Sequence, residues 1–413
     1  MFSRRLFLKN SAVAMFGVGA IPTWLSRAVY AKDAPGERKK ILIAIFQRGA
    51  VDGLNVVVPF GDRRYYEMRP TIAVPGPMRA SEDAAIDLDG FFGLHPNLAA
   101  LKPLWDRKML AIVEAVGSPD PTRSHFDAQD YMESGTPGYK NAQGGWLNRA
   151  LCPQAKASPL RAVSLTPDLP VTLRGPNEAV AVASIGNFQV KDSRAANIFE
   201  SIYGATADSV LNSTGRETFD AIKLMQSIQK TPYVPANGAQ YPNGKLGQSL
   251  QQIARLIKSN VGLEVAFTDV GGWDTHVQEM GQRASVGQLP NLLREFGGAL
   301  AAFSQDMGDR MEDIAVVTMS EFGRTAKENG NRGTDHGHAN VMFVLGGQVR
   351  GGKVYGNWPG LEQEQLYEGR DLALTTDFRT VLSELVRKQM GNRQIAPVFP
   401  GFSGVEMRGV LEA

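Results

Sequence analysis

The chain has 413 residues, of which 43% are hydrophobic and 21% are charged. These ordinary globular values exclude a disordered, a collagenous and a coiled-coil protein. The formal net charge is +2, but residues 1–31 hold four cations and no acids, so residues 32–413 carry a charge of −2. A near-neutral chain with no basic run lacks the charge pattern of a nucleic-acid-binding or membrane-surface protein.

The first 31 residues have the features of an export signal. A basic start with Arg4 and Arg5 precedes an apolar stretch over 11–25, and a small residue, Ala31, stands at the expected cleavage point. The arginine pair followed by Leu-Phe-Leu-Lys is typical of the bacterial twin-arginine signal. We therefore expect the twin-arginine export machinery as a partner and a periplasmic or secreted mature protein. The alternative is an uncleaved membrane anchor, although glycines and a proline interrupt the apolar stretch.

Short apolar runs alternate with helical patterns along residues 32–413. Apolar residues repeat at helical spacing over 246–257 and 292–307, and a last helix is expected to begin near Thr376. Runs that are apolar on both faces indicate buried parallel strands. These runs cover 41–46, 109–116, 161–165, 263–268, 314–319 and 341–345. The alternation predicts a single α/β domain, in which helices cover both faces of a mostly parallel sheet.

Three further features of the sequence constrain the structure of this domain. The stretch 231–247 contains three prolines and three glycines with almost no periodicity, so it is either a lid or a surface loop. No segment after the signal has 18 unbroken apolar residues, so we expect no membrane span once the signal is removed. The only cysteine is Cys152, which excludes a disulfide within the chain.

Polar clusters follow most of the predicted strands. In an open α/β sheet, ligands bind beyond the carboxyl ends of the strands. Arg48 and Asp52 follow the first strand, residues 118–127 follow the second, and segments 269–276 and 320–338 follow two later strands. Four of the five histidines in the chain lie in these segments. This edge of the sheet is therefore the candidate functional site.

The spacing of histidines and carboxylates predicts a metal site. Asp274 and His276 are two residues apart, as are His336 and His338, so each pair lies on one side of an extended segment. Imidazole and carboxylate donors with no nearby cysteine indicate zinc, manganese or another transition metal. The ligand set that we expect for one or two ions is Asp52, Asp274, His276, Glu321, Asp335, His336 and His338.

Ser124 has two interpretations. It stands at the start of a predicted helix with Asp127 three residues later, which is the pattern of a capping box. The same position places its hydroxyl where a helix N-terminus favours an anion, and a neighbouring metal would activate it as a nucleophile. Arg48 and Arg123 lie in the same post-strand segments, and the fork geometry of arginine suits the oxygens of a tetrahedral anion.

Four motifs together resemble the DUF1501 family of exported bacterial proteins. They are FQRGAVDGLN at 46–55, TRSHFDAQ at 122–129, GGWDTH at 271–276, and MSEFGRT at 319–325 with DHGH at 335–338. The family is placed in the alkaline phosphatase and sulfatase superfamily. The resemblance therefore implies a three-layer αβα sandwich, alkaline phosphatase-like, with its site at the carboxyl edge of the sheet.

By order along the chain, Asp52 resembles the early metal ligand of that superfamily and Ser124 its nucleophile. The later histidines and acids resemble its remaining ligands. The chain departs from the superfamily pattern in two places: Asp274 and His276 are closer together than the phosphatase pair, and Glu321 stands where those enzymes usually have an Asp-His pair. The nucleophile also stays open between Ser124 and Thr122.

The residues and the resemblance favour an exported, metal-dependent hydrolase of phosphate or sulfate esters, with a small anionic ester as its substrate. The alternative is a non-catalytic periplasmic binding or assembly protein with the same fold, in which the cluster holds a structural metal or none. An open site would favour the hydrolase, whereas a closed site would favour the structural metal.

Replacing Arg4 and Arg5 together by lysine should leave the precursor in the cytoplasm, because the arginine pair is the part of the signal that the export receptor reads. Immunoblots of cytoplasmic and periplasmic fractions measure this distribution. Arg27→Lys, which leaves the pair intact, is the control. Mature Arg4→Lys/Arg5→Lys protein in the periplasm at the normal level would show that this is not a twin-arginine signal.

Overall fold

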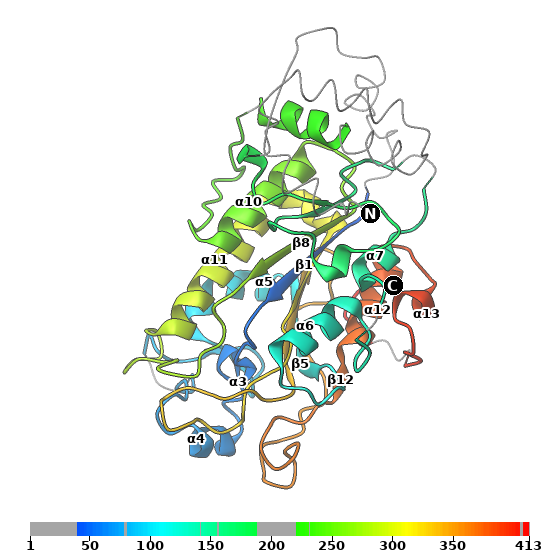
Figure 1. Cartoon of the computed structure of the whole chain (residues 1–413). Helices are drawn as coiled ribbons and strands as arrows, with labels where there is room; N and C mark the ends of the chain where they lie inside the picture. The colour runs from blue at the N-terminus through cyan, green and yellow to red at the C-terminus, as the bar shows by residue number, and fades with distance from the viewer. Residues whose placement is uncertain are drawn as a thin grey trace.

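The computed structural model describes residues 39–77, 81–140, 142–154, 157–187, 220–230, 232–404 and 408–412. The export signal predicted over 1–31 lies outside the described residues. A nine-stranded sheet passes through the centre of the molecule, with helices on both of its faces (Figure 1). Within the described ranges, no helix is long and apolar enough to cross a bilayer.

The sheet contains all six strands that the apolar runs predict. These are β1 (Ile41–Gln47), β5 (Leu110–Gly117), β6 (Ala162–Ser164), β8 (Val265–Val270), β9 (Ile314–Met319) and β10 (Asn340–Gly346). Three short strands extend it: β7 (Val180–Ala181), β11 (Lys353–Tyr355) and β12 (Thr376–Asp377). The order across the sheet is β11-β5-β10-β9-β1-β8-β6-β7, with β12 also paired to β5. β1 pairs in parallel with β8 on one side and with β9 on the other.

One strand departs from the parallel arrangement expected for all six runs. β10 is antiparallel to both of its neighbours, β9 and β5. Residues 320–339, which connect β9 to β10, contain no helix, so the chain re-enters the sheet at the edge where β9 ends. The start of β10, rather than its end, therefore lies at the carboxyl edge of the parallel strands. The mostly parallel sheet is confirmed, and β10 is its exception.

The two faces of the sheet are covered by different helices. Along β1, alternate residues belong to two separate hydrophobic clusters, since successive side chains of a strand point to opposite faces. α10 (Lys245–Lys258) and α11 (Gln288–Met307) contribute to one cluster. α6 (His125–Ser134), α7 (Trp146–Ala150), α12 (Phe378–Lys388) and α13 (Ile395–Val398) contribute to the other. The predicted three-layer αβα arrangement is therefore confirmed (Figure 1).

The remaining elements are short. A three-stranded sheet of β2 (Val57–Val58), β4 (Gly93–Leu94) and β3 (Ile86–Asp87) lies between β1 and β5 along the chain. The same stretch holds α3 (Gly53–Val56), α4 (Arg63–Met68) and α5 (Lys102–Asp106). Single 3-10 turns cover Pro96–Leu101, Val171–Leu173, Ile185–Asn187 and Gly308–Asp313.

The segment interpreted as a lid or a loop is irregular over 232–244 and is attached to α11. The buried carboxylate of Asp306 accepts hydrogen bonds from the hydroxyls of Tyr233 (2.5 Å) and Tyr241 (2.8 Å). It also accepts one from the backbone N–H of Ala236 (2.6 Å) and pairs with Lys258. One carboxylate therefore fixes three points of the segment to the end of α11.

A buried ion pair holds the chain that leaves β1. Asp52 and Arg69 are 1% and 0% exposed, and two nitrogens of the guanidinium donate to the two carboxylate oxygens. Arg69 also donates to the carbonyl oxygens of Thr325 and Ala326, which lie beyond β9. Burial acts to raise the pKa of Asp52, but Arg69 outweighs it and holds this pKa below its ordinary value. The pair thus joins the loop after β1 to the loop after β9.

Asp52→Asn should lower the free energy of unfolding by about 3–5 kcal/mol, because it leaves Arg69 as a buried charge without a counterion. Urea denaturation followed by circular dichroism measures this change. Asp106→Asn, which removes the half-exposed pair with Lys102, is the matched control and should change stability little. Equal midpoints for Asp52→Asn and wild type would mean that the buried pair does not stabilise the fold.

Candidate metal centre

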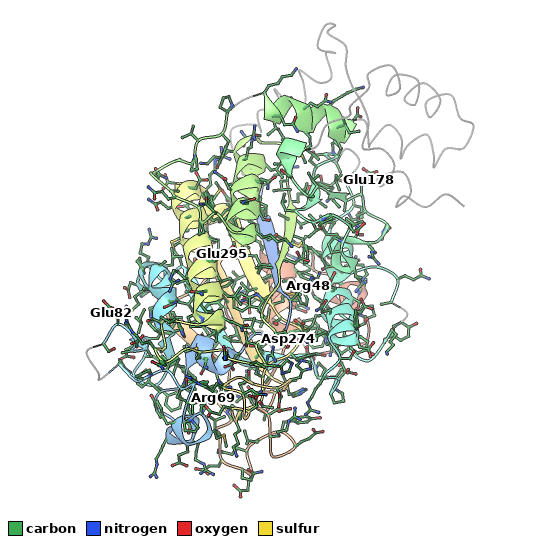
Figure 2. All side chains as sticks on the ribbon, turned by 60° about the vertical axis from the view of Figure 1, so that its left-hand side comes forward. Arg48, Arg69, Glu82, Glu178, Asp274 and Glu295 are labelled. Carbon is green, nitrogen blue, oxygen red and sulfur yellow. The ribbon has the colours of Figure 1, made fainter. Side chains whose placement is uncertain are left out.

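The histidines and carboxylates come from four segments at one edge of the sheet. His125 begins α6, after β5, Asp274 and His276 follow β8, and Glu321 follows β9. His336 precedes β10, whose start lies at the same edge because this strand is antiparallel. Figure 2 shows Asp274 toward the lower end of the molecule, below Arg48 and above Arg69.

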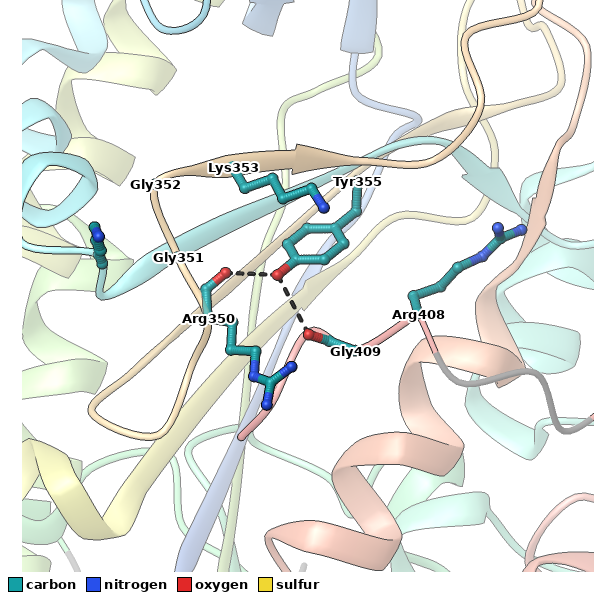
Figure 3. Close-up of a pocket in the computed structure, with 8 residues that line it drawn as sticks. Arg350, Gly351, Gly352, Lys353, Tyr355, Arg408 and Gly409 are labelled. Atoms are coloured by element: carbon teal, nitrogen blue, oxygen red, sulfur yellow. Dashed lines mark hydrogen bonds between the residues drawn. The ribbon is translucent and has the colours of Figure 1, made fainter. Parts of the chain in front are cut away.

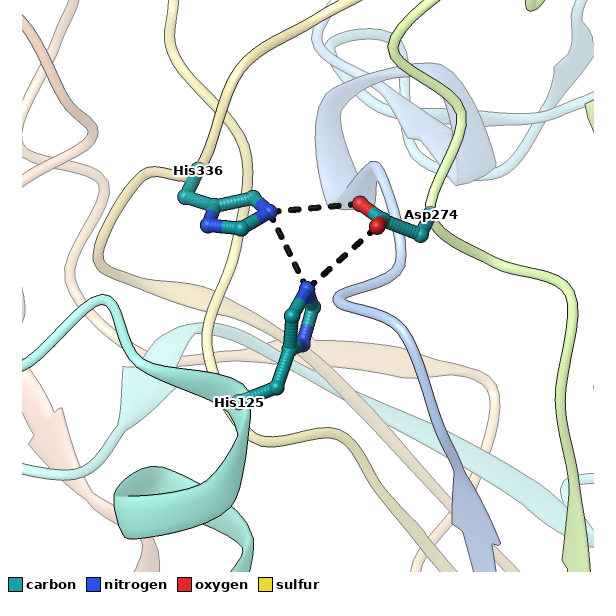
Figure 4. A group of neighbouring side chains, drawn as sticks. All are labelled: His125, Asp274 and His336. Atoms are coloured by element: carbon teal, nitrogen blue, oxygen red, sulfur yellow. Dashed lines mark hydrogen bonds and ion pairs between the residues drawn. The ribbon is translucent and has the colours of Figure 1, made fainter.

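Three imidazoles and one carboxylate face one another. Nε2 of His336 lies 3.0 Å from Nε2 of His125, 3.0 Å from Nε2 of His276 and 3.2 Å from Oδ1 of Asp274. Oδ2 of Asp274 lies 3.5 Å from Nε2 of His125. Among the described residues, His125, Asp274 and His336 form a group whose donor atoms all lie within 4.8 Å of one another (Figure 4). His276 adjoins this group through His336 and Asp274.

Each imidazole has an acceptor at its other ring nitrogen. The Nδ1 contacts are His125 to Oε1 of Glu321 (2.8 Å), His276 to Oδ1 of Asp335 (3.1 Å) and His336 to the carbonyl oxygen of Arg123 (3.0 Å). Ionised carboxylates and carbonyl oxygens only accept hydrogen bonds, so in the neutral imidazoles each Nδ1 donates. Each Nε2 consequently presents its lone pair to the centre of the group.

These donors fit a divalent transition metal. Lone pairs and a carboxylate oxygen that face one another at 3.0–3.5 Å repel unless a cation lies between them. Zinc bonds of about 2.0–2.1 Å in a tetrahedron place the ligand atoms roughly 3.3 Å apart. In metal sites, the second nitrogen of a ligand histidine usually donates to a carboxylate or a carbonyl oxygen. The residues present therefore match both the spacing and the orientation that such a metal needs.

The group is open to solvent while its supports are buried. The side chains of His125 and His336 are each 25% exposed, and that of Asp274 is 45% exposed. The hydrogen bond to Glu321 raises the pKa of His125, whereas burial lowers the pKa of His336. Burial acts to raise the pKa of Glu321, but hydrogen bonds from His125 and Gln129 outweigh it and hold this pKa below its ordinary value. Glu321 is thus an ionised acceptor beneath an accessible group.

Ser124 is the N-cap residue of α6, but its hydroxyl makes no capping hydrogen bond. Its backbone N–H donates instead to Oγ1 of Thr122 at 3.2 Å, and the carboxylate of Asp127 pairs with Lys140. The expected capping box is therefore wrong, because Thr122 and Lys140 take the contacts that it would use. The exposed Ser124 hydroxyl, next to His125 in sequence, is left without a capping role.

Arg48, which directly follows β1, joins β8 to α6. Its Nε donates to Asp269 at 2.7 Å, and its two terminal nitrogens donate to Gln129 and Glu133 at 2.8 Å each. Asp269 belongs to β8, whereas Gln129 and Glu133 belong to α6, the helix that begins at His125. The whole guanidinium fork is therefore used in holding α6 against the sheet.

Arg123 is also paired with carboxylates. It donates to Asp371 at 2.6 and 3.1 Å and to Glu368 at 2.7 Å. Its side chain is 27% exposed, and its carbonyl oxygen is the acceptor for His336. Arg123 thus reaches the surface beside the group, and its backbone orients one of the imidazoles.

Glu321 and Asp335 of the predicted ligand set contact Nδ1 of His125 and of His276 instead of joining the donors of the group. Two further residues of the predicted set lie apart from the group. Asp52 is held by Arg69 in the buried pair described above. His338 is 7% exposed, and its ring stacks on Tyr367 with centroids 4.3 Å apart. Burial lowers the pKa of His338, which favours its neutral form. The structure thus brings neither side chain into the group.

Three residues outside the predicted ligand set support the centre. His125 is one, and its signal in the sequence was its place among the four post-strand histidines. Arg324 is 2% exposed and donates to Oδ1 of Asp274 at 2.7 Å. Glu279 is fully buried and accepts from the hydroxyls of Thr275 (3.1 Å) and Thr334 (2.8 Å). Arg324 lies in the post-strand segment 320–338, whereas Glu279 has no signal in the sequence, because a buried acid cannot be told from an exposed one before its partners are known.

The pKa of Glu279 is raised well above its ordinary value, first by burial and then by the carboxylate of Asp52. Burial and this neighbouring charge thus favour the protonated form of Glu279. Thr275 lies between Asp274 and His276, and Thr334 precedes Asp335. One buried side chain thus holds together the two segments that supply these groups.

The chain is similar to two solved structures at low sequence identity. The first is the C-terminal periplasmic domain of EcEptC from Escherichia coli in complex with zinc, at 8% identity and a TM-score of 0.30, covering 76% of this chain and 74% of that one. The second is the alkaline phosphatase from the Antarctic bacterium TAB5, at 10% identity and a TM-score of 0.27, covering 75% and 93%. No curated protein matches the chain significantly.

A family model described as a protein of unknown function, DUF1501, matches residues 109–397. The match begins just before β5 and ends in α13, so it spans well over half of the chain. It contains His125, Asp274 and His336, together with every strand from β5 onwards. The chain belongs to the DUF1501 family.

Proposed function

We propose that the protein is a metal-dependent hydrolase of phosphate or sulfate esters. The observation that carries this proposal is the openness of the group formed by His125, Asp274 and His336. These side chains and that of the adjoining His276 are 25–45% exposed. A structural zinc site is closed by protein ligands, whereas a catalytic one keeps a position for water or substrate. Convergent donors that remain accessible favour the catalytic type.

Each residue around the group would have a different role in ester hydrolysis. A divalent metal such as zinc or manganese would be held by His125, Asp274 and His336, and it would supply positive charge that stabilises developing negative charge on oxygen. Ser124 is the proposed nucleophile, since its exposed hydroxyl has no capping role at the start of α6. The N-terminus of α6 favours a bound oxyanion. Arg123 is the better placed of the two predicted arginines to contact that anion, because Arg48 is used in holding α6.

Export is part of the proposal. The twin-arginine pathway and a periplasmic or secreted location rest on residues 1–31 alone. In that setting the substrate would be a small anionic ester outside the inner membrane. One or two ions remain compatible with the donors, because His276 adjoins the compact group without being one of its three members.

A non-catalytic binding or assembly role is the second candidate, and one observation favours it. Both arginines that were expected to hold a tetrahedral anion already contact carboxylates. A protein of this kind would retain the metal but show no turnover. Metal content and ester hydrolysis therefore have to be measured separately.

His336→Ala should weaken zinc binding by at least about 100-fold, since its Nε2 contacts both other members of the group and the adjoining His276. Elemental analysis after dialysis against a zinc buffer measures the effect. His338→Ala is the matched control: this histidine is two residues away, yet it stacks on Tyr367 outside the group. Equal zinc content in the two variants would contradict a centre at His336.

Ser124→Ala should abolish hydrolysis of chromogenic phosphate and sulfate esters while the melting temperature stays near that of wild type, because the hydroxyl caps no backbone group. Zinc content should also be unchanged, which separates a lost nucleophile from a lost metal. Thr122→Ala is the companion variant. Full activity in a folded Ser124→Ala protein would exclude Ser124 and make Thr122 the candidate.

A further inference from the structure

A pocket of about 440 Å³ lies at the opposite edge of the sheet from the candidate metal centre. Lys108 precedes β5 and Lys353 begins β11, so the pocket sits at the amino ends of these two parallel strands. β5 rises about 3.3 Å per residue, so its length alone separates the pocket from the carboxyl edge by roughly 23 Å. The pocket is therefore a separate place on the molecule, and it does not depend on the proposed hydrolase function.

Its lining is basic. Four cations, Lys108, Arg350, Lys353 and Arg408, border the pocket, and no carboxylate is among the lining residues. Many other arginines of the fold, such as Arg324, contact a carboxylate. Among the described residues, no ion pair joins any of these four cations to an acid. Four cations at one pocket repel one another, and a bound anion would relieve that repulsion.

Glu384, the acidic residue that contacts the chain next to the pocket, already has its own hydrogen-bond partners. Glu384 accepts hydrogen bonds from the backbone N–H groups of Gly409 (3.0 Å) and Leu411 (2.9 Å), and its carboxylate also contacts Lys388. It is fully buried beneath the chain that carries Arg408. Its carboxylate therefore stabilises the backbone under the pocket and does not neutralise the lining cations.

The floor of the pocket is fixed by backbone contacts. The hydroxyl of Tyr355 donates to the carbonyl oxygen of Arg350 at 2.7 Å and lies 3.3 Å from that of Gly409 (Figure 3). The backbone N–H of Arg350 donates to the carbonyl oxygen of Val410 at 2.8 Å. Two distant chain segments are thus joined, so the cations project from a preorganised frame.

Two of the cations have identifiable positions in this frame. Lys353 lies over the ring of Tyr355, with Nζ 4.9 Å from the ring centroid. One terminal nitrogen of Arg408 donates to the carbonyl oxygen of Thr375 at 2.9 Å, and its buried Nε meets no acceptor within the part of the chain that the structure describes. Both cations are thus held at fixed places in the lining.

We propose that this pocket binds a group with two or more phosphate charges, such as a diphosphate. Phosphate oxygens only accept hydrogen bonds, and arginine and lysine are the side chains that bind them best in proteins. The four cations come from three segments, at 108, 350–353 and 408, which explains why the sequence shows no basic run. A free diphosphate and the phosphorylated headgroup of a lipid share this chemistry.

Isothermal titration calorimetry of sodium pyrophosphate into the mature, metal-free protein tests the proposal. We expect saturable binding that weakens as salt is added, because ion pairs at a surface are screened. Arg350→Gln with Lys353→Gln should lower the affinity at least about tenfold, since two charge-assisted contacts are lost. Arg63→Gln with Arg283→Gln removes the same charge from two exposed ion pairs and is the matched control. Melting temperatures show that each variant remains folded.

The control distinguishes a site from general charge attraction. Absence of saturable binding to wild type, or equal weakening in both double variants, would overturn the proposal. Co-sedimentation with vesicles of phosphatidylcholine and phosphatidic acid identifies the source of the phosphate. Sedimentation that is lost in the Arg350→Gln/Lys353→Gln variant supports the pocket with a lipid headgroup as its ligand. Pyrophosphate binding without vesicle binding supports it with a soluble ligand.

Discussion

Arg324 donates hydrogen bonds from all three guanidinium nitrogens to the loops after β1 and β8 and to the segment before β10. Its acceptors are the carbonyl oxygens of Gly49, Ala50, Trp273 and Thr334 and the carboxylate of Asp274, at 2.6–3.0 Å. A guanidinium is planar and rigid, so these loops keep fixed separations. The buried charge also needs a counterion, and Asp274 supplies it. One carboxylate therefore both neutralises the buried arginine and belongs to the candidate metal group.

The residues that support the centre are buried, whereas the imidazoles and the carboxylate of the group are accessible to solvent. A binding or catalytic site requires this arrangement. Below the group, Arg324 fixes Asp274, Glu279 fixes the flanking threonines, and Glu321 orients His125. Arg48 then holds α6 in place, and with it the helix start that carries His125. These contacts lie within the fold and leave Nε2 of each imidazole directed at the group. The surface cations at the opposite edge show the reverse pattern, because no acid of the described segments forms an ion pair with them.

Much of the fold was predictable, because apolar runs and helical spacing record burial directly in the sequence. The direction of β10 was not, since it depends on where the connection after β9 returns to the sheet. The histidines after the predicted strands indicated the edge of the sheet at which the group lies. Which of these imidazoles contact one another depends on the orientation of each ring. The predicted ligand set contains His338 but not His125, because their neighbours Tyr367 and Glu321 are distant in sequence. The partner of Asp52 was hidden for the same reason.

The antiparallel strand also affects how the chain can assemble. His125 and His336 are 211 residues apart, and β10, which follows His336, lies between β5 and β9 in the finished sheet. During synthesis β5 therefore cannot pair with the rest of the sheet until β10 has been made. Pairings this distant in sequence make folding slow and leave strand edges exposed in the meantime. Because His336 reaches its partners only when β10 is in place, a metal would stabilise the completed fold and could not nucleate it.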